Sequence, residues 1–211
     1  MATLESFNQH LIESLNENIH TIKYCLSFDK SSSLWNGSSK VGCLGIPAAI
    51  LIFSLIDAIG SYYKDGTVEF SIDGKYEKIT KPSQHFYVLN DQIYFKNQFE
   101  MNTINDLYSA YRSKLTHNNV LPLNNFLDIG TCDSVILEKT PDGHISKLNL
   151  RPLFEVVKTG IVIFIQNLQS GTISTNNSTI LEIEKHSKAY IDLTLESTTG
   201  QTSTATGHTH M

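Results

Sequence analysis

The chain has 211 residues, of which 40% are hydrophobic and 18% charged, so it is long enough to bury a sizeable core without disulfides or metal. Its formal net charge of −5 argues against a broad nucleic-acid surface, because such surfaces are usually basic, and leaves room for a small local cationic site. Three widely spaced cysteines without a Cys-x-x-Cys pair argue against a disulfide or zinc framework and indicate buried thiols in a reducing compartment.

We expect neither a signal peptide nor a membrane span. The stretch from Met1 to Phe7 lacks the basic start and apolar core of a signal peptide. The longest apolar run, Leu44 to Ile56, is shorter than the roughly 20 residues that a spanning helix needs, which favours a buried helix. The expected location is the cytoplasm, with no membrane contact.

Two helices are predicted in the first third of the chain. Apolar residues recur at steps of three and four from Leu4 to Leu26, which is typical of an amphipathic helix. A second helix begins near Pro47, which suits a first helical turn, and runs to about Tyr63. It is apolar nearly all round, as a central helix of a bundle would be, apart from a polar line of Ser54, Asp57 and Ser61.

Two hairpins and two further helices follow. Residues 67–79 predict a hairpin around Asp73-Gly74, which is a strong type I′ signal. A connecting stretch leads to a third helix over roughly Gln98 to Leu115. A second hairpin is predicted over residues 135–150, and a fourth helix covers Pro152 to Leu168.

These elements predict an α+β fold that is mainly α, with β-hairpin decorations around a helical core. Residues 1–168 form a single helical domain with hairpin insertions near 67–79 and 135–150. Residues 169–196 alternate in polarity like short strands, so we expect a β-rich extension there. The tail over 197–211 is rich in Ser and Thr and is expected to be disordered.

One pair of residues is suited to chemistry on RNA. Arg112 and His117 stand five positions apart at the end of the third helix. Arginine is a permanent cation whose donors fit a phosphate, and histidine is the side chain that ordinarily exchanges protons near neutrality. Metal-independent RNA cleavage needs a base for the 2′-hydroxyl, an acid for the leaving 5′-oxygen and a cation for the charge on phosphorus. One histidine does not easily serve both proton roles, and a dimer with two copies of the pair would supply two.

Helix geometry sets a condition on this pair. In an unbroken α-helix two side chains five positions apart point about 140° away from each other. They converge on one ligand only if the helix frays or turns near Leu115-Thr116. Asn118-Asn119 and Pro122 are compatible with such an ending, because asparagine tolerates a left-handed cap and proline cannot continue a helix.

The stretch Leu107-Tyr108-Ser109-Ala110-Tyr111-Arg112-Ser113-Lys114-Leu115-Thr116-His117-Asn118 resembles the motif of the HEPN superfamily. Members are α-helical bundles, and many are ribonucleases of toxin–antitoxin, abortive-infection and CRISPR systems. The resemblance covers roughly residues 1–63 and 98–168. It implies that Arg112 and His117 are the catalytic residues and that Ser113 takes the polar position commonly held by Asn, Asp or His. It also implies an acidic residue on an earlier helix, here Asp57, which would hold the arginine or fix the histidine tautomer.

The resemblance leads us to expect a metal-independent endoribonuclease of a toxin–antitoxin or phage-defence system, which acts on RNA as a homodimer without cofactor or metal. The alternative is a non-catalytic HEPN-like module that binds a protein partner, such as an antitoxin, or a nucleotide. A third interpretation is an unrelated α+β protein. There Arg112 is a solvated or paired cation, His117 caps its helix, and Asp57 is a buried acid bonded to Ser61 or another helix. His208 and His210 would bind a metal only adventitiously.

Overall fold

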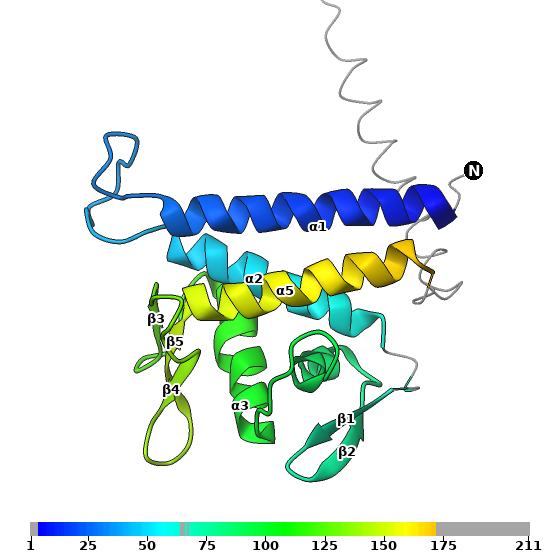
Figure 1. The fold of residues 1–211 in the computed structure, drawn as a ribbon. Helices are drawn as coiled ribbons and strands as arrows, with labels where there is room; N and C mark the ends of the chain where they lie inside the picture. Colours follow the sequence, from blue (N-terminus) through cyan, green and yellow to red (C-terminus); the bar gives the residue numbers. More distant parts are fainter. Residues whose placement is uncertain (1–3, 64–65, 67, 172–211) are drawn as a thin grey trace, which may run out of the picture.

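Three long helices form the framework of the computed structural model, which describes residues 4–63, 66 and 68–171. They are α1 (Leu4–Ser27), α2 (Gly45–Ser61) and α5 (Leu150–Gln169). All three lie against one another, and α1 runs antiparallel to α2 and α5 (Figure 1). Together with two small sheets they give an α+β fold, the class that the sequence pattern predicted.

The core is built around α2, which contacts both other long helices and several of the shorter elements that lie between α2 and α5 in the chain. Its sequence is apolar nearly all round, so it can bury side chains on several faces at once. Burial of each large apolar side chain of this kind stabilises the fold by about 1.5–3 kcal/mol. The buried residues of α2 are Ala48, Ala49, Ile52, Phe53, Leu55, Ile56, Ile59 and Gly60.

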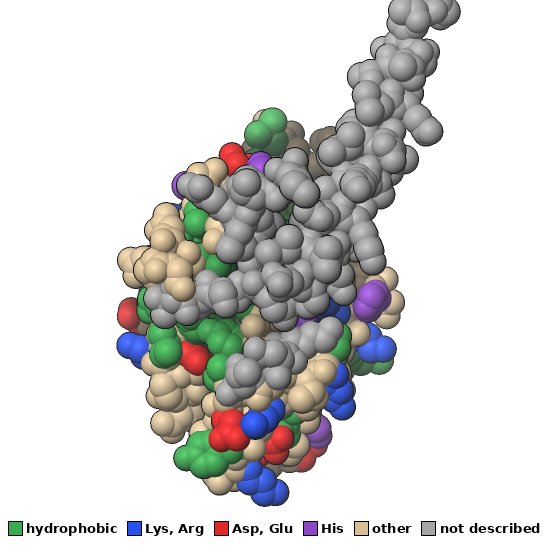
Figure 2. Space-filling model, turned by 90° about the vertical axis from the view of Figure 1, so that its right-hand side faces the viewer, with side chains coloured by type: hydrophobic (Ala, Val, Ile, Leu, Met, Phe, Trp, Pro, Cys, Tyr) green, Lys and Arg blue, Asp and Glu red, His purple; other side chains and the backbone are tan. Residues whose placement is uncertain are grey.

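The first hairpin forms where it was predicted. Strands β1 (Glu69–Ile72) and β2 (Lys75–Lys78) pair antiparallel across Asp73 and Gly74. Both turn residues have positive φ, 51° and 73°, as a type I′ turn requires. β1 buries alternate side chains. Figure 2 shows charged side chains of both signs at the lower end of the molecular face that it draws.

The stretch after the hairpin contains an element that the sequence pattern did not predict. Pro82–Asn90 forms the 3-10 helix η1, and its last six residues, from His85 onward, are buried. The side chain of Gln84 caps its start, since Oε1 accepts the backbone N–H groups of Thr80 and Lys81 at 3.0 and 3.2 Å. η1 packs mainly on α2.

The helix that carries Arg112 and His117 has three successive segments: α3 (Met101–Asp106), the π-helical η2 (Leu107–Ser113) and α4 (Lys114–Asn118). It is capped by Asn119 in the left-handed conformation, with φ 52°. The helix therefore runs three residues past its expected end at about Leu115 and ends at Asn118-Asn119, the residues that suggested an ending in the sequence. The helix passes through the Leu115-Thr116 step without a break and ends after His117.

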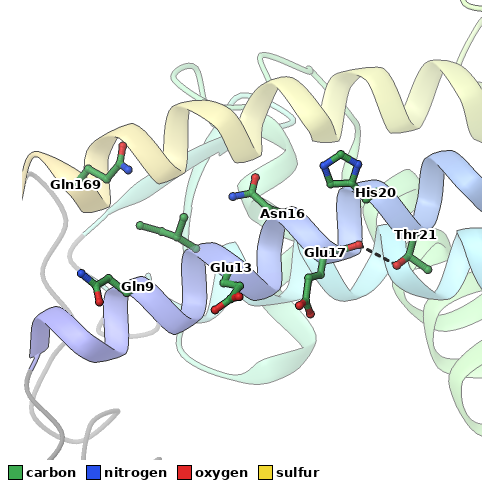
Figure 3. A pocket seen from close by; sticks show the side chains of 8 residues that line it. Gln9, Glu13, Asn16, Glu17, His20, Thr21 and Gln169 are labelled. Carbon is green, nitrogen blue, oxygen red and sulfur yellow. Dashed lines mark hydrogen bonds between the residues drawn. The ribbon is translucent and has the colours of Figure 1, made fainter.

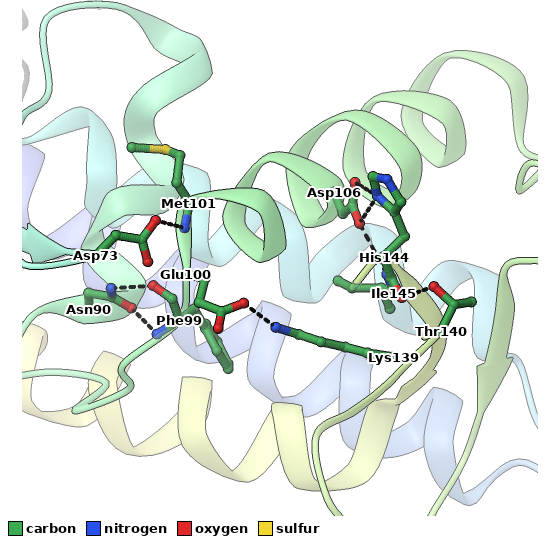
Figure 4. A network of polar contacts seen from close by, with 10 residues as sticks. All are labelled: Asp73, Asn90, Phe99, Glu100, Met101, Asp106, Lys139, Thr140, His144 and Ile145. Atoms are coloured by element: carbon green, nitrogen blue, oxygen red, sulfur yellow. Dashed lines mark hydrogen bonds and ion pairs between the residues drawn. The ribbon is translucent and has the colours of Figure 1, made fainter. Parts of the chain in front are cut away.

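Polar contacts from both sheets hold the α3 segment of this helix (Figure 4). Asp73, at the hairpin turn, accepts the backbone N–H of Met101 through Oδ2 at 3.0 Å. At the end of α3, Asp106 accepts the backbone N–H of Ile145 at 3.0 Å. Because α3 is fixed at both ends, the direction of the segments that follow it is fixed as well.

The second sheet has three strands in the order β3-β5-β4: β3 (Phe126–Asp128), β4 (Leu137–Lys139) and β5 (Ile145–Asn149). β4 and β5 pair antiparallel and form the second predicted hairpin. β3 pairs parallel with β5 and was not predicted. Apart from residues 169–171, the predicted β-rich extension over 169–196 lies outside the described residues, as do the tail over 197–211 and its two histidines.

Candidate functional site

The site is organised around Asp57, near the end of α2. A carboxylate in so apolar a helix needs donors from other elements. Its Oδ2 accepts an N–H from Nη2 of Arg112 at 2.7 Å, and its Oδ1 lies 2.7 Å from Nδ1 of His85. One carboxylate thus joins α2, η1 and η2, and we call Asp57, His85 and Arg112 the Asp57 cluster.

Arg112 reaches Asp57 from the π-helical segment η2. Hydrogen bonds in such a segment span five residues, so its turn is wider than an α turn, and π segments are frequent at functional sites. The guanidinium carbon lies 5.4 Å from the ring centroid of Tyr108, which is within cation–π range. The side chain is 24% exposed, and Asp57 is the one acceptor that its N–H groups meet among the described residues.

His85 is more deeply buried than the other members of the cluster, since its side chain is only 9% exposed. Its backbone lies directly over Gly60 of α2, where an added Cβ would come within 2.2 Å of the His85 carbonyl oxygen. Glycine at this position therefore allows η1 to approach α2 closely enough for the imidazole to reach Asp57. The other ring nitrogen, Nε2, is buried and has no hydrogen-bond partner among the described residues.

The electrostatics of the cluster favour an ionised Asp57. Burial by itself raises the pKa of this carboxyl, but the hydrogen bonds from His85 and Arg112 and the charge of Arg112 outweigh it and lower the pKa below its ordinary value. An ionised carboxylate is only an acceptor, so Nδ1 of His85 carries the proton of their shared hydrogen bond. The cluster therefore combines a fixed tautomer of His85 with a paired, partly exposed cation.

The other two predicted site residues stand apart from the cluster. His117 lies in the last turn of α4 and is exposed, without a hydrogen bond or ion pair to any described residue. Ser113 is half-buried at the end of η2. Arg112 lies in the π-helical η2 and turns to Asp57, whereas His117 lies in α4 and contacts no member of the Asp57 cluster through a hydrogen bond or ion pair. The structure brings Arg112 to Asp57 and does not bring His117 to either of them.

No sequence pattern predicted a role for His85. It lies in a stretch without helical or strand periodicity, so no pattern assigned it a face. The signal that pointed to it was indirect. A lone carboxylate in an apolar helix needs two acceptor oxygens satisfied, and one arginine N–H satisfies only one of them.

Other groups that carry chemistry are weaker candidates. Within the described ranges no three His, Cys, Asp or Glu side chains come together in a way that could hold a metal ion. Cys25 and Cys43 are buried, and burial raises the pKa of both thiols, which makes them poor nucleophiles. Cys132 is exposed, contrary to the expectation of buried thiols.

A shallow groove of about 720 Å³ lies between α1 and α5. Figure 3 shows that most of its labelled side chains come from one face of α1, with Gln169 contributed by α5. The face carries amides, two glutamates and His20, and Thr21 donates to the backbone oxygen of Glu17 at 2.8 Å. No member of the Asp57 cluster lines it.

No family model matches the chain, and neither a search of curated proteins nor a search of solved structures finds a match. In the part of the chain that the structure describes, no helix has the length and hydropathy needed to cross a membrane.

Proposed function

We propose that this protein is a HEPN-like, metal-independent endoribonuclease, in which Arg112 binds the scissile phosphate and His117 transfers protons. The observation that carries the proposal is the ion pair between Asp57 and Arg112. It holds the cation through one N–H and leaves the others on a partly exposed side chain, as a phosphate clamp requires.

The proposed reaction uses the RNA itself as the nucleophile. A base removes the proton of the 2′-hydroxyl, the 2′-oxygen attacks phosphorus, and the bond from phosphorus to the 5′-oxygen breaks. The 5′-oxygen takes a proton from an acid, which leaves a 2′,3′-cyclic phosphate and a 5′-hydroxyl. His117 suits a proton-transfer role because its imidazole is exposed at the end of the helix, where a substrate can reach it.

A homodimer is part of the proposal. His117 makes no hydrogen bond or ion pair to the Asp57 cluster of its own chain, so a phosphate held by Arg112 would receive its proton carrier from a second copy. In a two-fold dimer each of the two symmetric sites would combine Arg112 of one copy with His117 of the other. We further propose, from the resemblance alone, a cytoplasmic role in a toxin–antitoxin or phage-defence system.

The test is RNA cleavage by the purified protein in the presence of a metal chelator, with single-stranded and structured RNA. We expect products with 2′,3′-cyclic phosphate ends, lost in Arg112→Ala and in His117→Ala. Matched controls are Lys114→Ala, an exposed cation on the same helix, and His20→Ala, an exposed histidine on α1. Activity that survives both site substitutions, or no activity with any RNA, would overturn the proposal.

A second candidate is a non-catalytic HEPN-like module that binds a protein partner, such as an antitoxin, or a nucleotide. The unbroken helix between Arg112 and His117 favours it, since the pair does not converge within one chain. The same assay separates the two functions. Specific binding of RNA or of a partner without any cleavage, unchanged by His117→Ala, supports the binding module.

A further inference from the structure

The two oxygens of Asp57 are divided between two donors. Oδ1 takes the imidazole of His85 and Oδ2 takes one N–H of Arg112, each at 2.7 Å. A guanidinium and a carboxylate otherwise favour a bidentate pair with two parallel hydrogen bonds. With His85 at Oδ1, Arg112 makes a single hydrogen bond to its counter-ion.

His85 is placed to keep that oxygen occupied. The cap by Gln84 fixes the start of η1, and the close approach over Gly60 fixes the backbone of His85 itself. Its Nε2 is buried, so the ring cannot touch a substrate at the surface and acts only through its contact with Asp57.

The residue after His85 supports Arg112 from another side. Phe86 packs edge-on against Tyr108, with ring centroids 5.7 Å apart and an interplanar angle of 83°. Tyr108 in turn places its ring beside the guanidinium of Arg112. Two consecutive residues of η1 therefore contact the two groups that hold this cation.

We infer that His85 is a positioning residue, which occupies one oxygen of Asp57 so that Arg112 keeps N–H groups available for a phosphate. Without a donor at position 85, Arg112 takes both oxygens and commits one whole edge of its guanidinium to Asp57. The phosphate then meets a guanidinium that has one N–H group fewer to offer. The RNA readouts of this inference rest on the proposed function, and the spectroscopic readout does not.

Two substitutions separate a positioning role from a catalytic one. His85→Asn retains a donor close to the place of Nδ1 but has no ring nitrogen to exchange protons. His85→Phe retains the ring and has no donor. Where His85→Phe fails to fold, His85→Gln is the second variant, because it moves the amide donor away from the place of Nδ1.

The spectroscopic arm follows the guanidinium N–H signals of Arg112 in protein labelled with ¹⁵N-arginine. The chain has two arginines, Arg112 and Arg151, so Arg151→Lys assigns the spectrum. We expect the Arg112 signals of His85→Asn to match those of the wild type. Those of His85→Phe should shift and exchange more slowly with solvent, as a bidentate pair would. Arg112 signals that are identical in all three proteins would overturn the inference.

The binding arm uses a 2′-O-methyl oligoribonucleotide, which has the RNA phosphates but no free 2′-hydroxyl. We expect His85→Phe to weaken binding about fivefold to tenfold, the effect of losing part of a charge-assisted hydrogen bond, and to raise KM more than it lowers kcat. His85→Asn should bind and cleave within about twofold of the wild type, a difference well under 1 kcal/mol. Loss of kcat in a folded His85→Asn would overturn a positioning role. A wild-type protein that cleaves no RNA would overturn the proposed function and leave the spectroscopic arm to decide on His85.

Discussion

Gly60 lies directly beneath the backbone of His85, where a Cβ would meet the His85 carbonyl oxygen at 2.2 Å. Gly60 follows Asp57 by three residues on α2, so the close approach and the carboxylate are on neighbouring positions of one helix surface. The distance between α2 and η1 at this point determines whether His85 can reach Asp57. The geometry of the Asp57 cluster therefore depends on a residue without a side chain.

Replacement of this glycine should disturb the cluster without changing any of its members. Gly60→Ala forces η1 away from α2, and we expect the free energy of unfolding to fall by about 1–3 kcal/mol, as for other overpacked sites. Urea unfolding measures the loss. The matched control is Gly45→Ala on the same helix, whose Cβ would have its nearest contact at 3.6 Å from Leu150. If the two variants were equally stable, the close packing of η1 on α2 would not be needed for the fold.

Asp57→Asn should be destabilising although it preserves shape. An amide offers one acceptor where the carboxylate offers two, so either His85 or Arg112 faces an N–H instead of an oxygen. Loss of hydrogen bonds between charged groups at a partly buried site should cost about 1–3 kcal/mol. Chemical denaturation compares it with Ser54→Ala, an exposed change on the same helix. A loss no greater than that of Ser54→Ala would mean that the cluster adds little to stability.

The stability that Asp57 contributes should depend on pH. Hydrogen bonds from His85 and Arg112 lower the pKa of Asp57 in the folded state, despite its burial. Its contribution is therefore complete above the unfolded pKa of about 3.9 and is lost as the pH falls through the lower, folded pKa. Urea unfolding of the wild type and of Asp57→Asn between pH 6 and about pH 2.5 should show a difference that shrinks below about pH 4. Asp29 and Asp142, whose pKa values are also lowered, contribute equally to both proteins. A difference that stays constant over this range would contradict the assignment.

Much of the framework was predictable because the relevant signals are local. The step of three and four in the first helix predicted α1 to within a residue, and Asp73-Gly74 predicted the first turn with its positive φ values. The polar line on the second helix singled out Asp57 as a group that needs a partner. These features depend on residues close together in the chain.

The remaining features depend on contacts between distant segments. η1 has no periodicity and is helical because it is buried on α2 and capped by Gln84. β3 is three residues long and pairs with a strand that follows about 20 positions later, which no local pattern specifies. The π turns that carry Arg112 have no sequence signature, and the meeting of His85 with Asp57 spans 28 positions. Within the Asp57 cluster, the sequence therefore singled out Asp57 and Arg112 but not His85.

The separation of Arg112 from His117 leads to a test of the proposed dimer. If each active site combines Arg112 of one copy with His117 of the other, a dimer of one Arg112→Ala chain and one His117→Ala chain has one intact site and one that lacks both residues. Such mixed dimers are obtained by co-expression with two different affinity tags and sequential purification. We expect them to cleave RNA at about half the wild-type rate, because one of the two symmetric sites is complete. Each parent variant alone should be inactive. Mixed dimers as inactive as their parents would show that both residues act within one chain, and the continuous helix between them would then have to open before catalysis.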